Sequence, residues 1–472
     1  MFRIILARYR FRKFSSWLAA LALLSGVGRA QGEALPAALP EDLLPELKQL
    51  LQTASTQSPA IVAKNIDVAQ AEALRIQDRA GLFPTLSASG GYSNVESAIA
   101  GEAGSKSSND GVFYGVYFSQ PLFHWGALKH QHDIGKIGVQ LAEKSYAEAY
   151  RTLTLTIRKQ YLALIQSKME VRNREFAARA AESFLGLQEA KLRDGRLSQG
   201  EIIHPRLALE EARIRAGRAQ AEYESAKRLL ARTVGVPDID DSTVPSSIPR
   251  PTYAPQTLGA YFETLKNTSL ENTFMGDYYR QSIEQAQMRY RIARVRLLPK
   301  FSLSASYNQS NYSQIERLAT GDRVVQTELT STVYGITGFW TLFDGLATRG
   351  AKLSALAAKR LAERSLDTYL ESTSESIRLL EKQIGFSGRM MDLTDTRRQL
   401  AFAAVKKVSD DVRSGVSPQA TLDKFTAEAY DSELASLSAQ AEFLSHWSEY
   451  VSLLGVDPVL ANISPRYLRH GK

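Results

Sequence analysis

The chain has 472 residues and a mass of 52.2 kDa, and 44% of its residues are hydrophobic, which excludes a wholly disordered protein. Six of its 58 Lys and Arg residues lie in residues 1–30, which hold no acid, so the remaining 52 nearly balance the 50 Asp and Glu. A nucleic-acid partner is therefore not expected, and the absence of cysteine excludes disulfides, thiol nucleophiles and thiolate metal sites.

Residues 1–30 have the pattern of a secretory signal peptide. A basic start is followed by an apolar run from Trp17 to Val27, and Gly28-Arg29-Ala30 places small residues at positions −3 and −1 of a cleavage site. The apolar run is shorter than the roughly 20 residues of a transmembrane anchor. We therefore expect export with cleavage after Ala30, followed by an N-terminal extension at 31–44.

The rest of the chain contains one pattern twice. Leu82-Phe83-Pro84 reappears 215 positions later as Leu297-Leu298-Pro299, and beyond that point the offset is 220, so that Arg193-x-Gly195 matches Arg413-x-Gly415. One register kept across different kinds of segment indicates a tandem duplication. The predicted units are repeat 1 at 45–255, repeat 2 at 256–457 and a C-terminal tail at 458–472.

Each repeat is expected to contribute one hairpin of two strands. Residues 300–308 alternate polar and apolar without a break, and Leu86, Ala88 and Tyr92 share one face in repeat 1. The stretches 100–111 and 314–328 are polar and are expected to be loops. Two hairpins alone are marginal, so further strands are expected from other copies of the chain. The predicted strands are 84–98, 111–122, 299–312 and 329–342.

The remaining segments are predicted to be helical. No proline occurs in 124–194 or 344–414, so each of these segments can form one helix of roughly 100 Å. A heptad seam of largely apolar residues occurs in both. The seam consists of Leu366, Leu370, Thr373, Ile377, Leu380 and Ile384, with Tyr146, Tyr150, Leu153, Ile157, Gln160 and Leu164 at the matching positions. The other predicted segments are return helices at 199–235 and 419–454, a connector at 236–255, and helices at 45–82 and 267–297 that lead into strands.

In their order and double occurrence, these segments resemble the TolC-type outer membrane efflux and secretion proteins, the outer membrane factors, over about residues 43–455. The motifs that carry the resemblance are Leu297-Leu298-Pro299 before a strand, Pro121-Leu122-Phe123 and Thr341-Leu342-Phe343-Asp344-Gly345 after one, and a Gly-Val pair closing each copy. The resemblance implies an α+β membrane protein that forms a homotrimer. Four strands from each protomer would form a 12-stranded β-barrel in outer membrane lipid, continued by a long antiparallel α-helical coiled-coil tunnel across the periplasm.

The resemblance also implies a function and partners. It implies a passive exit duct of a tripartite efflux or type I secretion system, with a periplasmic adaptor (membrane fusion) protein and an inner-membrane RND or ABC-type pump. Since the chain has no cysteine, it would not carry the N-terminal lipid of some relatives. The alternative is a soluble periplasmic coiled-coil adaptor or scaffold, which the alternating strands disfavour.

Two turns after the long helices are candidate sites. Glycine and serine there suit ordinary helix ends, whereas the resemblance implies adaptor docking. The docking candidates are Gly195, Leu197, Ser198, Gly415, Val416 and Ser417. The resemblance also places acidic residues that narrow the tunnel just beyond each turn, and Glu201 and Asp423 are the candidates, although Thr421 and Lys424 occupy the usual acidic positions in repeat 2. A solvated surface carboxylate is the alternative for each.

Aromatic residues in the strands could form a belt at the membrane surface, or could simply reflect the preference of aromatics for strands. The candidates are Tyr92, Tyr114, Tyr307, Tyr334 and Trp340. Histidines make no ligand spacing, and no P-loop, HExxH or dinucleotide-binding glycine motif occurs. We expect no metal site, no cofactor and no enzymatic activity.

Overall fold

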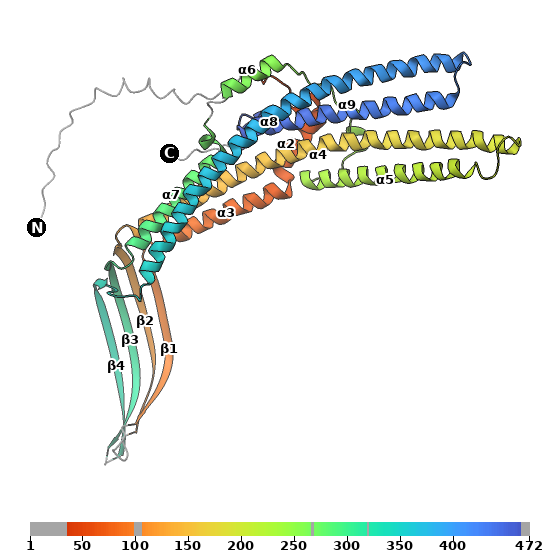
Figure 1. Cartoon of the computed structure of the whole chain (residues 1–472). Helices are drawn as coiled ribbons and strands as arrows, with labels where there is room; N and C mark the ends of the chain where they lie inside the picture. Colours follow the sequence, from red (N-terminus) through yellow and green to blue (C-terminus); the bar gives the residue numbers. More distant parts are fainter. Residues whose placement is uncertain (1–34, 99–105, 266–268, 319–320, 464–472) are drawn as a thin grey trace, which may run out of the picture.

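The protein is described here from a computed structural model, which covers residues 35–98, 106–265, 269–318 and 321–463. The predicted signal peptide at 1–30 lies outside the described residues, as does most of the predicted tail at 458–472. A sheet forms one end of the molecule, and a long helical body extends away from it at an angle (Figure 1).

The sheet has four antiparallel strands: β1 (Thr85–Ala98), β2 (Lys106–Phe123), β3 (Lys300–Leu318) and β4 (Gly321–Phe339). Their order is β1-β2-β3-β4, so the hairpins of the two repeats are joined by the β2–β3 pair. Two strands begin earlier than expected, because polar residues predicted as loop continue the ladder. In the second hairpin the pairing runs as far as Leu318 with Gly321. Backbone pairing needs no apolar side chains, which is why the polarity of 314–328 was a misleading signal.

The register separates the two faces of the sheet. Leu86 lies opposite Phe118, which lies opposite Ala305, which lies opposite Tyr334, so one row of apolar side chains crosses all four strands on one face. The next row, with Ser87 and Ser306 in it, points to the other face. The apolar face consists of Leu86, Ala88, Tyr92, Val112, Tyr114, Val116, Phe118, Phe301, Leu303, Ala305, Tyr307, Tyr334 and Ile336. The opposite face is rich in serine and glycine but also carries Phe113, Tyr117, Leu329 and Val333.

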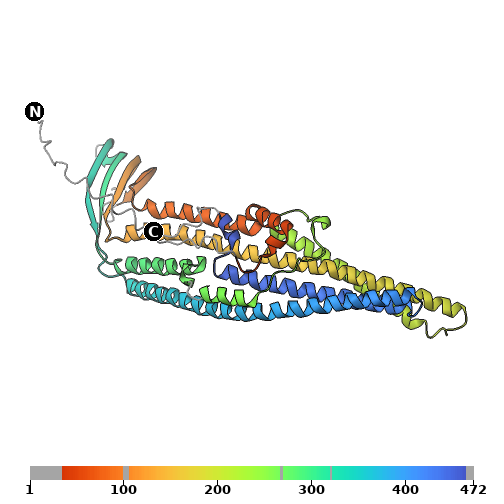
Figure 2. The ribbon, with the colours of Figure 1, turned by 90° about the horizontal axis from the view of Figure 1, so that it is seen from above.

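Two helices of 67 residues each run through the helical body, α4 (Ala127–Arg193) and α8 (Ala347–Arg413). At 1.5 Å per residue each is about 100 Å long. α3 (Pro59–Ala80) and then α5 (Ile203–Val234) lie along α4, while α7 (Phe274–Arg294) and then α9 (Gln419–Leu453) lie along α8 (Figure 2). Contacts of α4 with α7 and α9 join the two repeats.

The helices predicted at 45–82 and 267–297 are both interrupted. α2 (Pro45–Gln57) ends before Ser58, and α3 starts at Pro59, because proline lacks an N–H and disfavours helical geometry in the residue before it. α7 begins only at Phe274, where the Thr273 side chain accepts a hydrogen bond from the Gly276 N–H. The remaining short elements are α1 (Pro40–Leu43), α6 (Pro255–Leu265) and the 3₁₀ turns η1 (Asp241–Thr243), η2 (Leu270–Asn272) and η3 (Pro458–Asn462).

The core lies in the middle of the helical body, where the predicted seam of α4 is buried except for the partly buried Gln160. Arg158 is fully buried there and forms ion pairs with Glu41 and Asp457, which lie near the two ends of the described chain. Burial alone would lower the pKa of Arg158, but the hydrogen bonds and charges of the two carboxylates raise it, so the guanidinium stays charged. None of the helices that the structure describes is both long and apolar enough to cross a membrane.

Candidate functional site

The two predicted turns lie at the end of the helical body farthest from the sheet (Figure 1). In the first turn, Gly195 has φ +71°, its N–H donates to Leu192 O at 3.1 Å, and the Arg196 N–H donates to Lys191 O at 2.9 Å. In the second, Gly415 has φ +78° and the Val416 N–H donates to the Asp411 carbonyl at 2.8 Å. Both turns therefore end a long helix with the Schellman motif, which requires a left-handed residue at the glycine position.

Glu201 belongs to the first turn itself. Its Oε2 accepts hydrogen bonds from the Ser198 hydroxyl and the Ser198 N–H, both at 2.7 Å. These bonds lower the pKa of the exposed Glu201 carboxyl, so the carboxylate is the favoured form. α5 begins at Ile203, later than the predicted 199. Gln199 and Gly200 lie in a turn, because glycine is a poor helix former.

The second turn is different in chemistry. Val416 is 76% exposed at its tip, and Ser417 is half-buried. α9 starts directly after Pro418, and Asp423 in its first turns is half-buried and accepts a hydrogen bond from Gln419 Nε2 at 2.9 Å. Each predicted constriction carboxylate is thus bonded within its own repeat. The first turn presents charge through Arg196, whereas the second presents an apolar side chain.

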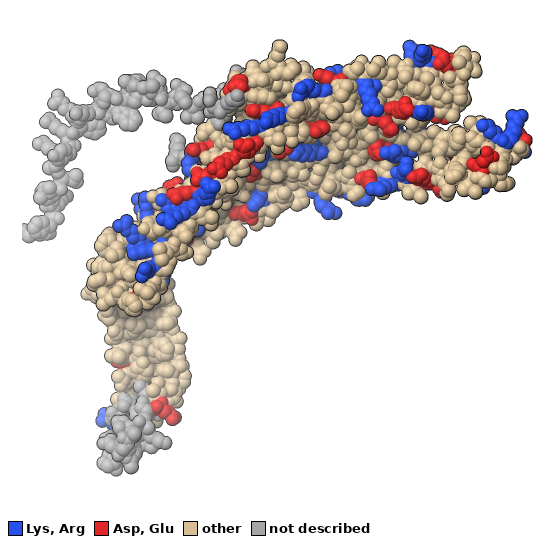
Figure 3. Space-filling view, in the orientation of Figure 1, with Lys and Arg blue, Asp and Glu red and all other residues tan. Residues whose placement is uncertain are grey.

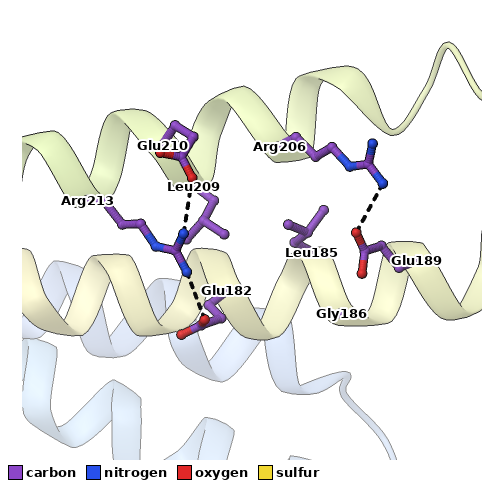
Figure 4. A pocket seen from close by; sticks show the side chains of 8 residues that line it. All are labelled: Glu182, Leu185, Gly186, Glu189, Arg206, Leu209, Glu210 and Arg213. Atoms are coloured by element: carbon purple, nitrogen blue, oxygen red, sulfur yellow. Dashed lines mark hydrogen bonds and ion pairs between the residues drawn. The ribbon is translucent and has the colours of Figure 1, made fainter.

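A groove of about 530 Å³ lies between α4 and α5 near the first turn (Figure 4). The side chains of Leu185 and Leu209 lie between the two helices, and Gly186 of α4 lines the same groove. Ion pairs cross it on both sides of these residues, from Arg206 to Glu189 at 3.3 Å and from Arg213 to Glu182 at 3.0 Å. These two ion pairs therefore hold α5 against α4 close to the turn. Sequence reasoning did not identify the groove.

The residues of the predicted aromatic belt lie at different heights on the apolar face. The Tyr114 and Tyr307 hydroxyls both donate to Gln309 Oε1, at 2.6 and 2.9 Å, where the apolar rows give way to polar residues. Tyr92, which donates to Asp110 Oδ2 at 3.4 Å, lies at the same edge. Tyr334 lies among the apolar rows and is 82% exposed.

Trp340 lies at the opposite edge, directly after β4. Trp125 follows β2 at the same end of the sheet, and its Nε1 donates to the Pro299 carbonyl at 2.7 Å. Sequence reasoning missed Trp125, although its place two residues after Leu122-Phe123 was a usable signal. The apolar face is thus bounded by hydrogen-bonding aromatic side chains at both ends. Among the described residues, no group of three or more His, Cys, Asp or Glu side chains is placed to hold a metal ion.

Comparison with known proteins bears on this architecture. Residues 50–236 match the family model described as outer membrane efflux protein. No curated protein sequence shows a significant match. Among solved structures, the outer membrane channel CmeC of Campylobacter jejuni aligns with a TM-score of 0.69 over 94% of each chain, at 15% identity.

Two further structures align similarly. The outer membrane protein VceC of Vibrio cholerae gives a TM-score of 0.61 at 18% identity, over 88% of this chain and 98% of its own. The open-state outer membrane channel MtrE of Neisseria gonorrhoeae gives 0.61 at 18% identity, over 87% and 89%. The predicted resemblance is therefore confirmed: the chain has the fold of outer membrane channels, and its first repeat matches the efflux family. The matching family model and the aligned structures are described as outer membrane efflux proteins and outer membrane channels.

Proposed function

We propose that the protein is the outer membrane exit duct of a tripartite efflux or type I secretion system. In this function it conducts substrate passively from an inner-membrane RND or ABC-type pump, through a periplasmic adaptor, to the exterior. The mature, non-lipidated chain after Ala30 forms a homotrimer. Repeats 1 and 2 each supply one hairpin to the barrel, and each supplies one long helix with the shorter helices packed along it to the tunnel.

The observation that carries this proposal is the two-faced sheet with free edges. Within the described residues β1 and β4 each have a neighbour on one side only, and an exposed strand edge is a site for further pairing. Backbone groups in lipid must all be paired, which a closed barrel achieves and an open sheet does not. Three copies would give 12 strands with the apolar face toward lipid and the serine-rich face toward a water-filled lumen.

The height of the apolar face also suits a bilayer. Along β3 it extends from Pro299, beside Trp125, to Gln309, beside the Tyr114 and Tyr307 hydroxyls. Ten residues span roughly 33 Å along a strand, or about 25 Å along the membrane normal at a tilt of about 40°. This is about the height of the apolar band of an outer membrane barrel.

The turns are the proposed docking site for the adaptor, through Gly195, Leu197, Ser198, Gly415, Val416 and Ser417. Their position at the end opposite the sheet supports this assignment, and Val416 is exposed there to a partner. Glu201 and Asp423 are proposed to line the aperture at this end. Three copies of Glu201 held ionised by Ser198 would favour the passage of cations.

The alternative function, a soluble periplasmic adaptor or scaffold, does not account for the sheet. Its apolar face presents Tyr334, Leu86 and Ile336 to solvent as one contiguous surface. Monomeric soluble proteins rarely expose a patch of that kind. A channel places the same surface in lipid.

The chain has no cysteine, so single cysteines can report on the faces of the sheet. Leu86→Cys and Ser87→Cys place a thiol on neighbouring residues with opposite orientations. In protein reconstituted in vesicles, we expect a membrane-impermeant, water-soluble maleimide to label Ser87→Cys but not Leu86→Cys. Equal labelling of both thiols would contradict the lipid-facing assignment.

A photo-crosslinking residue tests the docking site in cells. At Val416 it is expected to give an adduct with a periplasmic adaptor protein, whereas at Ile76, an exposed position near the sheet, it is expected to give none. Adducts of the adaptor with both positions, or with Ile76 alone, would refute docking at the turns.

A further inference from the structure

Basic residues gather where the helical body meets the sheet. Four segments meet there: 75–84 at the end of α3, 124–136 at the start of α4, 289–300 at the end of α7, and 340–352 at the start of α8. Together they contain eleven Lys and Arg residues against three Asp and no Glu. We call these segments the basic collar. Figure 3 shows Lys and Arg concentrated on the visible side of this junction, next to a sheet surface almost free of charge.

This concentration is local and is not a property of the whole chain. The chain beyond residue 30 has 52 basic and 50 acidic residues, so outside the collar it has 41 basic against 47 acidic residues. The collar is thus strongly positive on a protein that is otherwise slightly negative. Its three acids are already engaged: Asp78 accepts from Gln131 Nε2, Asp133 pairs with Lys136, and Asp344 accepts from the Thr348 hydroxyl.

The helix dipole accounts for only some of the basic residues in the collar. Arg291 and Arg294 near the carboxyl end of α7 are favoured by the helix dipole. The long helices α4 and α8, however, begin at the collar with no acid in their first turns, and Lys129 and Arg349 lie within those turns. The dipole disfavours cations at that end, so helix energetics do not explain the bases there, whereas an anionic partner would.

The neighbouring surface indicates the nature of that partner. The collar adjoins the edge of the apolar face that carries the exposed Trp125 and Trp340, together with the exposed Leu342 and Phe343. An apolar band, interfacial tryptophans and then a row of bases is the order of surfaces that a membrane protein presents from the bilayer core to the headgroups.

We propose that the basic collar binds the headgroups of anionic phospholipids in the leaflet next to the helical body. The proposal rests on the proposed function, because it takes the apolar face of the sheet as the lipid-facing surface. Arg291, Arg294 and Arg296 are exposed in the one collar segment without an acid, and they are the residues on which binding depends most. Each base near an anionic surface contributes roughly five-fold in affinity.

Quenching of tryptophan fluorescence by brominated lipids measures which lipids lie next to the collar. Trp125 and Trp340 lie beside the collar, whereas Trp447 is fully buried in the helical body. The full-length mature protein is reconstituted in phosphatidylcholine vesicles in which a minor fraction is brominated phosphatidylglycerol or, separately, brominated phosphatidylcholine. We expect stronger quenching of tryptophan fluorescence by the brominated anionic lipid at equal fraction, and a loss of this preference in 1 M salt, where charges are screened within about 3 Å.

A triple variant tests the residues. Arg291→Gln, Arg294→Gln and Arg296→Gln together are expected to lower the preference for the anionic lipid at least five-fold. The matched control removes three exposed arginines from α5, far from the sheet: Arg215→Gln, Arg218→Gln and Arg232→Gln. The control is expected to keep the wild-type preference.

The outcomes separate this proposal from the proposed function. Equal quenching of the wild type by both brominated lipids would overturn lipid binding by the collar while leaving the sheet in the bilayer. Quenching by neither lipid would contradict the membrane location itself. If the triple variant keeps the lipid preference but changes the anion-to-cation permeability ratio of the channel, the bases face the lumen and the proposal is wrong.

Discussion

Replacement of Arg158 by methionine tests how the two ends of the chain are held to the helical body. Arg158 is 0% exposed in the middle of α4. Its Nε donates to Glu41 Oε2 at 2.9 Å, and its Nη1 donates to Asp457 Oδ2 at 2.5 Å. Glu41 lies in α1 and Asp457 precedes η3, so one guanidinium binds two segments that lie 117 and 299 residues away from it along the chain.

The expected magnitude follows from burial. Arg158→Met leaves two carboxylates, with side chains 6% and 0% exposed, without their counter-charge in a water-poor site. Removing one partner from a buried ion pair costs about 3–5 kcal/mol. Adding Glu41→Gln and Asp457→Asn to Arg158→Met removes the uncompensated charges, so this triple variant is expected to regain most of the loss.

Urea unfolding of the purified protein, followed by the helical circular dichroism signal, measures these differences. The matched control is Lys159→Met, next in sequence, whose ion pair with Glu449 is about half exposed and is expected to contribute at most about 1 kcal/mol. If Arg158→Met is no more destabilising than Lys159→Met, or if the triple variant is less stable than the single one, the buried network does not have the role assigned to it.

Three further predictions concern other parts of the molecule. Gly195→Ala and Gly415→Ala force a Cβ into left-handed geometry and are expected to destabilise the turns by about 1–2 kcal/mol each, measured as faster proteolysis at the turn; unchanged proteolysis would contradict the Schellman geometry. Lys144→Met removes one of the two ion pairs of the buried Asp277, the one at 3.1 Å, while Arg280 keeps the other, so the free energy of unfolding is expected to fall by about 1.5–3 kcal/mol, whereas a thermal midpoint equal to that of the wild type would refute this. Ser198→Ala removes a hydrogen bond that lowers the pKa of Glu201, so its pKa should rise toward the ordinary value. With a higher pKa, Glu201 becomes protonated, and so loses its charge, at a higher pH as the pH falls. The cation selectivity of Ser198→Ala should therefore decline at a higher pH than that of the wild type, and an unmoved pH midpoint would contradict the role of Ser198.

The sequence predicted those parts of the fold that depend on local pattern. The 67-residue helices α4 and α8 begin and end within three residues of the prediction, because absence of proline and a heptad seam are sufficient signals for a long helix. The bounds of β2 and β4 were less accurate, since polar residues such as those at 321–328 pair in the ladder without a hydrophobic pattern. The breaks before Pro59 and Phe274 depend on single residues that an overall helical composition conceals.

Some features of the candidate site could likewise be predicted from the sequence, and others could not. The turn glycines could be predicted from their place after a long helix, and the structure gives both the positive φ that this role requires. The Ser198–Glu201 bonds, the groove between α4 and α5 and the Arg158 network depend on side chains meeting in three dimensions. The basic collar is distributed over four segments, and only the run of five bases without an acid at 289–300 could have been noticed in the sequence.

We propose that three copies of the chain share one barrel in the outer membrane. The detergent-corrected mass of the mature protein extracted from outer membranes tests this proposal, because it examines location, membrane insertion and stoichiometry together. We expect a trimer that is released only by detergent. A monomer or dimer released without detergent would contradict it and would favour the soluble adaptor.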